Sequence, residues 1–92
     1  MSVDTDCQIE NRRTRVTRYR LPPGASIGFH RHAHDYVIVP VTSGQLRITE
    51  GGRVSIAELS RGVTYFRQAG VEHDVGNAGP DEMIFVEVEF LD

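Results

Sequence analysis

The spacing of glycine and proline most constrains what this chain can fold into. From residue 10 onward, turn residues divide the sequence into short segments of alternating apolar and polar residues, and no segment has a convincing helical periodicity. Pro22-Pro23-Gly24 forces one turn, and Gly51-Gly52 is typical of a two-residue hairpin. About eight short strands separated in this way predict an all-β protein, built as an antiparallel sandwich or barrel.

The length of the chain limits its domain organisation. The 92 residues suffice for one domain, and we interpret residues 1–9 as a flexible leader before a single domain at residues 10–92. A domain of this size buries roughly two-thirds of its unfolded surface, so a bound metal or a partner subunit would add useful stability.

Charge and hydropathy exclude several classes of partner. A net charge of −3 gives no reason to expect binding to nucleic acid or to an acidic membrane surface. No stretch approaches the roughly 18 apolar residues of a membrane span, and the first residues lack the apolar segment of a signal peptide. The single cysteine, Cys7, cannot form an internal disulfide. We therefore expect a cytoplasmic protein that acts on a small molecule.

Three of the four histidines have a spacing typical of a metal site. His30 and His32 are two residues apart, so in an extended strand both side chains project from one face, about 7 Å apart at their Cα atoms. His73, from a distant segment, can complete one side of a coordination sphere. Neutral imidazole is the commonest protein ligand for first-row transition metals, and three ligands leave positions open for water or substrate. The sequence therefore predicts a metal site at these three residues.

The segments around these histidines resemble the two motifs of the cupin superfamily. The resemblance covers about residues 20–90 and implies a cupin double-stranded β-helix, which is a small jelly-roll barrel. It is strongest to small single-domain cupins with an HRHxxDYVxVP-type core, some of which are labelled β-alanine degradation proteins. The motif positions in register are Gly24, His30 and His32 in the first motif, and Gly62, Gly70, His73 and Asn77 in the second.

The chain departs from the cupin motifs at three positions. The motif glutamate, usually a metal ligand, would fall at Tyr36, or at Val37 with the longer spacing. Gln68 takes the place of a proline in the second motif, and Gly44, which closes the first motif, comes one residue late. Pro40 lies inside a strand-like run, which predicts a bulge that would absorb the extra residue. These departures bear on the chemistry and leave the predicted fold unchanged.

What the resemblance implies about function depends on the ligand set, which has three histidines and lacks the motif glutamate. Cupins of this kind include iron(II) dioxygenases that act on thiols and on β-diketones. We therefore favour a metal-dependent dioxygenase that acts on a small anionic metabolite, with Fe2+ as cofactor and Zn2+, Ni2+ or Mn2+ as alternatives. Two other classes stay open. One is a redox-silent isomerase or lyase with Zn2+ or Ni2+ as Lewis acid, and the other is a non-catalytic ligand-binding cupin.

Two residues beside the predicted ligands are candidate catalytic groups. Tyr36 is in register with His30 and His32, and its neutral phenol would donate a hydrogen bond to a metal-bound oxygen rather than bind the metal. The alternative is a tyrosine of the barrel core. His34 would be a fourth ligand if the strand stayed regular. In cupins this strand usually bends after the second ligand, which would turn His34 toward the mouth as a proton shuttle or a solvated side chain.

The basic residues are all arginine, and five of the ten lie within residues 12–20. This segment is either a solvated or interface strand paired with acidic neighbours, or a rim that attracts a carboxylate substrate. Glu87 and Glu89 are plausible partners, on the opposite face of the last strand from Ile84, Val86, Val88 and Phe90. We expect a homodimer, with the arginine-rich strand and the last strand as candidates for the interface.

Overall fold

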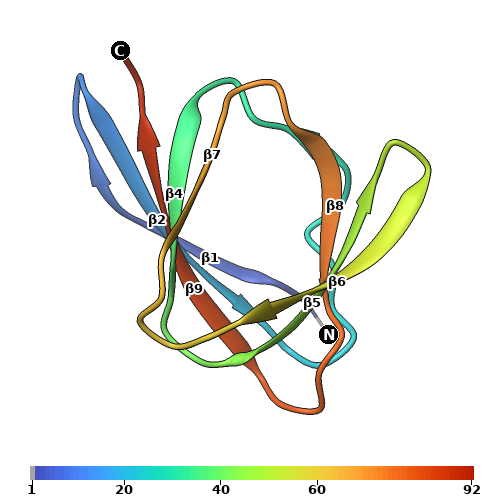
Figure 1. The fold of residues 1–92 in the computed structure, drawn as a ribbon. Helices are drawn as coiled ribbons and strands as arrows, with labels where there is room; N and C mark the ends of the chain where they lie inside the picture. The colour runs from blue at the N-terminus through green and yellow to red at the C-terminus, as the bar shows by residue number, and fades with distance from the viewer. Residues whose placement is uncertain (1) are drawn as a thin grey trace.

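The protein consists of two β-sheets, and the computed structural model describes residues 2–92. Within this range the chain forms no helix, so it has no helix that is long and apolar enough to cross a membrane. The all-β fold predicted from the sequence is therefore confirmed. The strands (Figure 1) are β1 (Asp4–Glu10), β2 (Thr14–Leu21), β3 (His30–Arg31), β4 (Asp35–Pro40), β5 (Gly44–Glu50), β6 (Arg53–Leu59), β7 (Tyr65–Arg67), β8 (Glu72–Asn77) and β9 (Met83–Phe90).

The strands are arranged in two antiparallel layers. One sheet has five strands in the order β1-β2-β9-β4-β7, and the other has four in the order β3-β8-β5-β6. The longest pairing joins distant segments, because β2 pairs with β9 from Thr14 opposite Phe90 to Leu21 opposite Met83. Figure 1 shows β2, β9 and β4 on one side of the molecule and β8, β5 and β6 on the other. This is the jelly-roll barrel that the resemblance implied.

The segment that carries the first two histidines is shorter than the continuous strand expected from the sequence. β3 contains only His30 and Arg31, and the chain bends at residues 32–34 before β4 begins at Asp35. β3 belongs to the four-stranded sheet and β4 to the five-stranded sheet, so this bend carries the chain from one layer to the other. The alternation of side chains between the two faces of a strand therefore ends at residues 32–34.

The predicted bulge at Pro40 is wrong. β4 pairs with β9 without a shift in register, from Asp35 opposite Phe90 to Pro40 opposite Phe85. Pro40 is the last residue of its strand, where a missing amide hydrogen costs no further ladder bond. The extra residue of the motif lies in the turn at residues 41–43, before Gly44 begins β5.

Most of the predicted leader is a strand. Residues 4–9 belong to β1, which pairs with β2 from Asp4 opposite Arg20 to Glu10 opposite Arg15, with a shift in register between Cys7 and Ile9. Every residue of β1 is exposed. Backbone pairing rather than burial therefore holds β1 at the edge of the sheet, which explains why its sequence carries no apolar pattern.

The interior of the barrel is apolar at one end and polar at the other. Along β9 the inward-facing residues are Met83 and Phe85, followed by Glu87 and Glu89, and each is at most 7% exposed. The outward-facing residues of the same strand are apolar. The last strand therefore turns its glutamates inward, which places two carboxylates inside the barrel. The buried core cluster is formed by Leu21, Tyr36, Ile38, Leu46, Leu59, Val75, Met83 and Phe85.

Candidate metal centre

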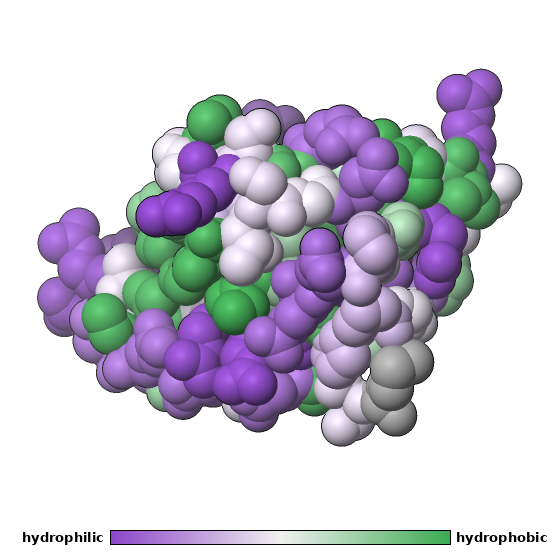
Figure 2. All heavy atoms as spheres, turned by 90° about the horizontal axis from the view of Figure 1, so that it is seen from below, coloured by the Kyte–Doolittle hydropathy of each residue, from purple (hydrophilic) through white to green (hydrophobic). Residues whose placement is uncertain are grey.

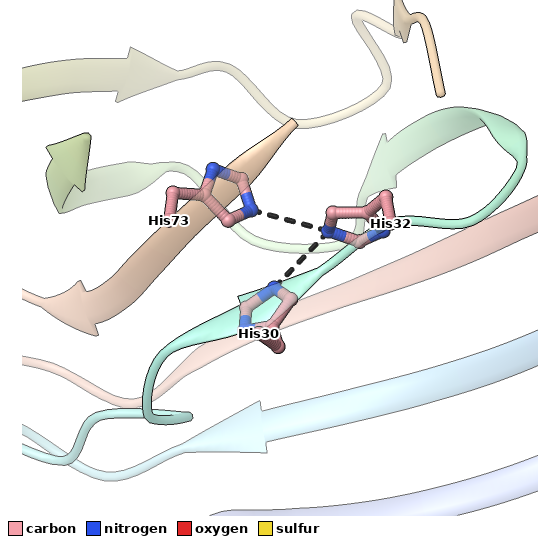
Figure 3. Close-up of side chains that lie close together, drawn as sticks. All are labelled: His30, His32 and His73. Atoms are coloured by element: carbon pink, nitrogen blue, oxygen red, sulfur yellow. Dashed lines mark hydrogen bonds between the residues drawn. The ribbon is translucent and has the colours of Figure 1, made fainter. Parts of the chain in front are cut away.

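Strand pairing brings the three predicted ligands together. His30 lies opposite His73 in the register of β3 and β8, so their side chains are cross-strand neighbours. His32 lies just after β3, where its amide donates to the Val71 carbonyl at 2.8 Å and its carbonyl accepts from the Gly70 amide at 2.8 Å. Two backbone bonds thus hold His32 beside the segment that leads into β8, and Figure 3 shows the side chains of His32 and His73 pointing toward one another.

The Nε2 atoms of the three histidines converge on one point. His32 Nε2 lies 3.0 Å from His30 Nε2 and 3.1 Å from His73 Nε2 (Figure 3). The candidate ligand atoms of all three residues lie within 4.8 Å of one another. Nitrogen lone pairs facing each other at this distance repel unless a proton or a cation lies between them. The arrangement therefore fits a cation at the centre.

The protonation states of the buried histidines favour metal binding. The pKa of His32 is lowered to about 4, mainly by burial and also by the neighbouring His30 and His73. Burial is also the main cause that lowers the pKa of His73 to about 4. Both rings are neutral near pH 7, and a neutral imidazole has a nitrogen lone pair to offer a metal.

The outer nitrogen of His30 is fixed by the backbone. His30 Nδ1 lies 2.7 Å from the Gly28 carbonyl oxygen, which can only accept a hydrogen bond, so the proton is on Nδ1 and the lone pair is on Nε2. Gly28 has a φ of 98°, a conformation that favours glycine, and its amide donates to Asp74 Oδ1 at 3.1 Å. Asp74 therefore supports His30 through one intervening residue.

The other two histidines differ in their outer contacts. His32 Nδ1 lies 3.7 Å from Glu87 Oε1, which places a carboxylate behind this ring. His73 Nδ1 is buried and has no hydrogen-bond partner within residues 2–92. A carboxylate behind a ligating histidine fixes its tautomer and makes its lone pair more basic.

Glu87 is the residue of this site that sequence reasoning missed. It is 5% exposed, and burial together with nearby Glu89 raises its pKa to about 7. The sequence suggested Glu87 as an arginine partner, but the structure places it against His32. The strand pattern carried no signal for this, because Met83 and Phe85 share a face with Glu87 while the opposite face is apolar throughout. Alternation separates the two faces, and the pairing of β9 between β2 and β4 decides which of them lines the interior.

The distances between the histidines bear on the choice of metal. For metal–nitrogen bonds of about 2.1 Å, neighbouring ligands would be about 3.0 Å apart in octahedral geometry and about 3.4 Å apart in tetrahedral geometry. The two Nε2 distances that involve His32, 3.0 and 3.1 Å, are near the octahedral value, and the candidate ligand atoms of all three residues lie within 4.8 Å of one another. Three imidazole ligands leave further positions on a metal for water or substrate. The donors present therefore fit a divalent transition metal.

Tyr36 lies beside the site as part of its wall. Its side chain is 2% exposed and stacks on the His32 ring, with centroids 3.9 Å apart and an interplanar angle of 20°. Burial raises its pKa, so the phenol stays protonated at neutral pH. The tyrosine belongs to the core cluster, as one of the two interpretations of the sequence expected, and it also lines the chamber at the histidines.

His34 does not join the other three histidines. It lies on the bend between β3 and β4, half-buried, outside the group of candidate ligands. Within the described chain it lines neither the chamber nor its entrance. The bend that carries the chain between sheets therefore separates His34 from the site, and its possible role as a fourth ligand finds no support.

A small chamber and a wider vestibule surround the histidines. The chamber has a volume of about 30 Å³ and is lined by all three histidines, Tyr36 and Glu87. The vestibule has a volume of about 310 Å³ and shares His30, His32 and Glu87 with the chamber. The chamber has room for about two waters, since one water needs at least about 10–15 Å³. A larger molecule would reach the metal site from the vestibule.

Two arginines line this vestibule. Arg15 forms a two-point contact with Glu89, with nitrogen–oxygen distances of 2.8 and 3.0 Å, which confirms one of the ion pairs suggested by the sequence. Arg31 also lines the vestibule and is exposed. It remains available to an anion, because the ion-paired arginines of residues 2–92 are Arg13, Arg15, Arg18, Arg20 and Arg67.

Comparisons with known proteins identify the family to which the chain belongs. The model of the cupin domain family matches residues 17–89. The chain is 51% identical over 84 residues to the β-alanine degradation protein BauB of Pseudomonas aeruginosa, covering 89% of this chain and 86% of that protein. It is 26% identical over 83 residues to an oxalate-binding protein of Thermotoga maritima, covering 90% and 67%. The crystal structure of a cupin domain from Bordetella pertussis is 44% identical, with a TM-score of 0.93 over 97% of this chain and 93% of the other.

Proposed function

Because the chain belongs to the cupin domain family, we propose that it is a metal-dependent enzyme that acts on a small anionic metabolite. His30, His32 and His73 would hold the metal. The reaction we favour is an oxygen-dependent oxidation at Fe2+. The observation that carries the proposal is the convergence of three imidazole nitrogens beside a vestibule that has room for a substrate, with His32 Nε2 3.0 Å from His30 Nε2 and 3.1 Å from His73 Nε2.

The charge of the site supports an anionic substrate. A metal held by three imidazole ligands keeps its 2+ charge, because the group of candidate ligands in the described chain contains no carboxylate and Glu87 lies behind His32. A carboxylate substrate could neutralise this charge while Arg31 binds it at the entrance. The names of two relatives also point to small carboxylates, because one is called a β-alanine degradation protein and the other an oxalate-binding protein.

Each of the chain's own residues has a distinct part in this proposal. The Glu87 carboxylate, 3.7 Å from His32 Nδ1, would favour the tautomer with its proton on Nδ1 and its lone pair on Nε2, and the hydrogen bond from His30 Nδ1 to the Gly28 carbonyl selects the same tautomer of His30. Tyr36 would limit the chamber and hold the His32 ring by stacking. Bound metal would supply Lewis acidity and, in the case of iron, electrons for oxygen chemistry.

The first test is the metal content of the untagged protein. We expect about one divalent metal per chain by mass spectrometry, its loss in His73→Ala, and its retention in the matched control His34→Ala. Iron together with oxygen consumption on thiol or β-diketone carboxylates would support the favoured reaction. A wild-type protein that takes up no metal even after reconstitution would contradict the proposal.

Two alternatives would give different results in the same experiment. A redox-silent isomerase or lyase would hold Zn2+ or Ni2+ and turn over equally well without oxygen. A non-catalytic binding protein would bind a carboxylate such as oxalate with no turnover at all, and the name of the Thermotoga maritima relative favours this alternative.

A further inference from the structure

Five residues line both the chamber and the vestibule at the histidines. They are Tyr19, Ile27, His30, His32 and Glu87. A residue that lines two adjoining hollows borders the passage between them. His30 and His32 belong to the metal centre, and Glu87 lies behind His32. Tyr19 and Ile27 are therefore the two residues of this border that the metal centre does not use.

The passage lies toward one end of the barrel, and the other end is filled. Leu21 and Met83 are paired where β2 ends and β9 begins, and they are 0% and 1% exposed. Figure 2 looks onto this end from below and shows side chains covering it. Arg15 and Glu89, which are paired near the opposite end, line the vestibule. A substrate group therefore approaches the histidines from that end, through the passage.

The ring of Tyr19 is fixed at the passage. The register of β2 and β9 places Tyr19 opposite Phe85, and their rings stack with centroids 5.2 Å apart and an interplanar angle of 19°. Tyr19 also packs against the core cluster. Stacked aromatic pairs stabilise each other beyond the area that they bury. The ring therefore keeps one position beside the histidines.

Ile27 is fixed from the other layer. Its amide donates to the Val75 carbonyl at 2.9 Å, and Val75 lies in β8 of the four-stranded sheet. Tyr19 lies in β2 of the five-stranded sheet. Each sheet thus contributes one border residue, and widening the passage would break either the backbone bond or the aromatic stack.

The hydroxyl of Tyr19 is an unused hydrogen-bond donor. No side-chain hydrogen bond within residues 2–92 involves it. The pKa of Tyr19 is raised to about 12, mainly by burial and also by Glu87 and Glu89. The phenol therefore keeps its proton at neutral pH and can donate it to a carboxylate oxygen in a hydrogen bond.

We infer that Tyr19 determines specificity for the carboxylate group of the substrate. Its hydroxyl binds that group at the passage, and its ring limits the size of the group that enters the chamber. The assignment rests on the proposed metal site and its anionic substrate. Hydrogen bonds to a charged acceptor are roughly twice as strong as those between neutral groups, so this contact favours carboxylates over neutral ligands.

The volumes of the two hollows suit such a division of the substrate. The chamber, at about 30 Å³, has room for about two waters, which is roughly the room that two carboxylate oxygens need. The vestibule, at about 310 Å³, can hold the rest of the molecule and has Arg31 in its wall. A carboxylate on an unbranched carbon can pass Tyr19, whereas a branched carbon next to the carboxylate would meet the ring.

The three tyrosines of the chain differ at this point. All three line the chamber, but Tyr36 and Tyr65 do not line the vestibule. Tyr36 stacks on His32, so its replacement would disturb a ligand. Tyr65 packs against the core cluster as Tyr19 does. Tyr65→Phe is therefore the matched control for Tyr19→Phe.

The experiment is a titration of full-length, Co2+-loaded protein with acetate. Binding is followed by the visible absorption of Co2+, which changes when a carboxylate enters its coordination sphere. We expect Tyr19→Phe to weaken acetate binding by about tenfold, as the loss of one hydrogen bond to a charged group does, with Co2+ content and circular dichroism unchanged. Tyr65→Phe should change acetate affinity by less than about twofold. Equal acetate affinity in Tyr19→Phe and wild type would overturn the role of the hydroxyl.

Trimethylacetate, which has the same charge and a branched carbon, tests the role of the ring. Wild type should bind it about tenfold more weakly than acetate, and Tyr19→Val should reduce this difference to about threefold or less. Ile27→Ala widens the passage from the other sheet and replaces Tyr19→Val if that variant does not fold. An unchanged preference for acetate in the widened, Co2+-loaded variant would overturn the role of the ring.

Failure of this inference and failure of the proposed function give different results. A wild type that holds Co2+ but shows no spectral change with acetate contradicts the role of Tyr19 and leaves the metal centre standing. A wild type that binds no Co2+ contradicts the proposed function, and the role of Tyr19 with it.

Discussion

Replacement of Glu87 by glutamine tests the role of the carboxylate behind His32. The substitution keeps size and shape but removes the charge that lies 3.7 Å from His32 Nδ1. A metal bound at Nε2 would lie roughly 8 Å from the carboxylate, allowing for the imidazole ring and a bond of about 2 Å. At an effective dielectric constant of about 20, a doubly charged metal and one carboxylate at that distance attract each other by about 4 kcal/mol.

This attraction is an upper value, because the buried carboxylate must first be ionised. Its pKa is raised to about 7, so part of the Glu87 side chains carry a proton at neutral pH before metal binds. Removal of a carboxylate behind a ligating histidine typically weakens metal binding by about 10- to 100-fold. We therefore expect Glu87→Gln to weaken metal binding by about that factor, or about 1.4–2.7 kcal/mol.

The assay is competition with a chromophoric chelator, starting from metal-stripped protein. The matched control is Glu89→Gln, which lies two residues along the same strand and is also buried but contacts Arg15 rather than a histidine. We expect the control to change metal affinity by less than threefold. Thermal unfolding without metal distinguishes positioning from a structural role. A neutral amide is easier to bury than a carboxylate, so metal-free Glu87→Gln should be at least as stable as wild type.

Equal metal affinity in Glu87→Gln and wild type would refute the reasoning. So would a loss of affinity accompanied by an equal loss of stability without metal, because that pattern indicates a damaged fold. A wild type that binds no metal is a separate result, which contradicts the proposed function itself.

Three further predictions follow from the same structure. In metal-free protein the pKa of His32 and His73 is lowered to about 4, and that of Glu87 is raised to about 7. Between pH 6.5 and 4.5 the unfolded state therefore binds about one more proton than the folded state. Stability in urea titrations should fall on acidification across this window by about 1.4 kcal/mol per pH unit, and a flat profile would contradict these shifts. Gly28→Ala should weaken metal binding because it strains a φ of 98° behind His30, whereas Gly52→Ala, at a φ of 78° in the β5–β6 hairpin, should leave chelator titrations unchanged. Leu46→Ala, at a side chain 2% exposed, should cost about 2–5 kcal/mol in urea unfolding, and a cost below about 1 kcal/mol would show that Leu46 is not core.

Much of the site could be predicted because its signals are local. The three ligands could be identified in the sequence without knowledge of the fold. Their signals are the two-residue spacing of His30 and His32 and the glycines that precede His73. Gly51 and Gly52 have φ values of 58° and 78° in the structure, which matches the predicted hairpin. Such signals work because turns and side-chain direction depend on a few neighbouring residues.

Other predictions depended on pairing between distant segments. His34 is two residues from His32, but the chain changes sheets between them, and only the order of the strands records that change. β1 is held by backbone hydrogen bonds to β2, and these bonds do not require apolar side chains. The sequence of β1 therefore carries no apolar pattern from which the strand could be predicted.

The sequence by itself determined the strand-rich architecture, the positions of the turns and the three converging histidines. The tertiary structure decided which face of the last strand points inward, and with it the position of Glu87 behind His32 and of Val88 on the outward side of the sheet. The reason is physical. Alternation along a strand separates two faces, but burial against the opposite sheet decides which of them becomes the interior.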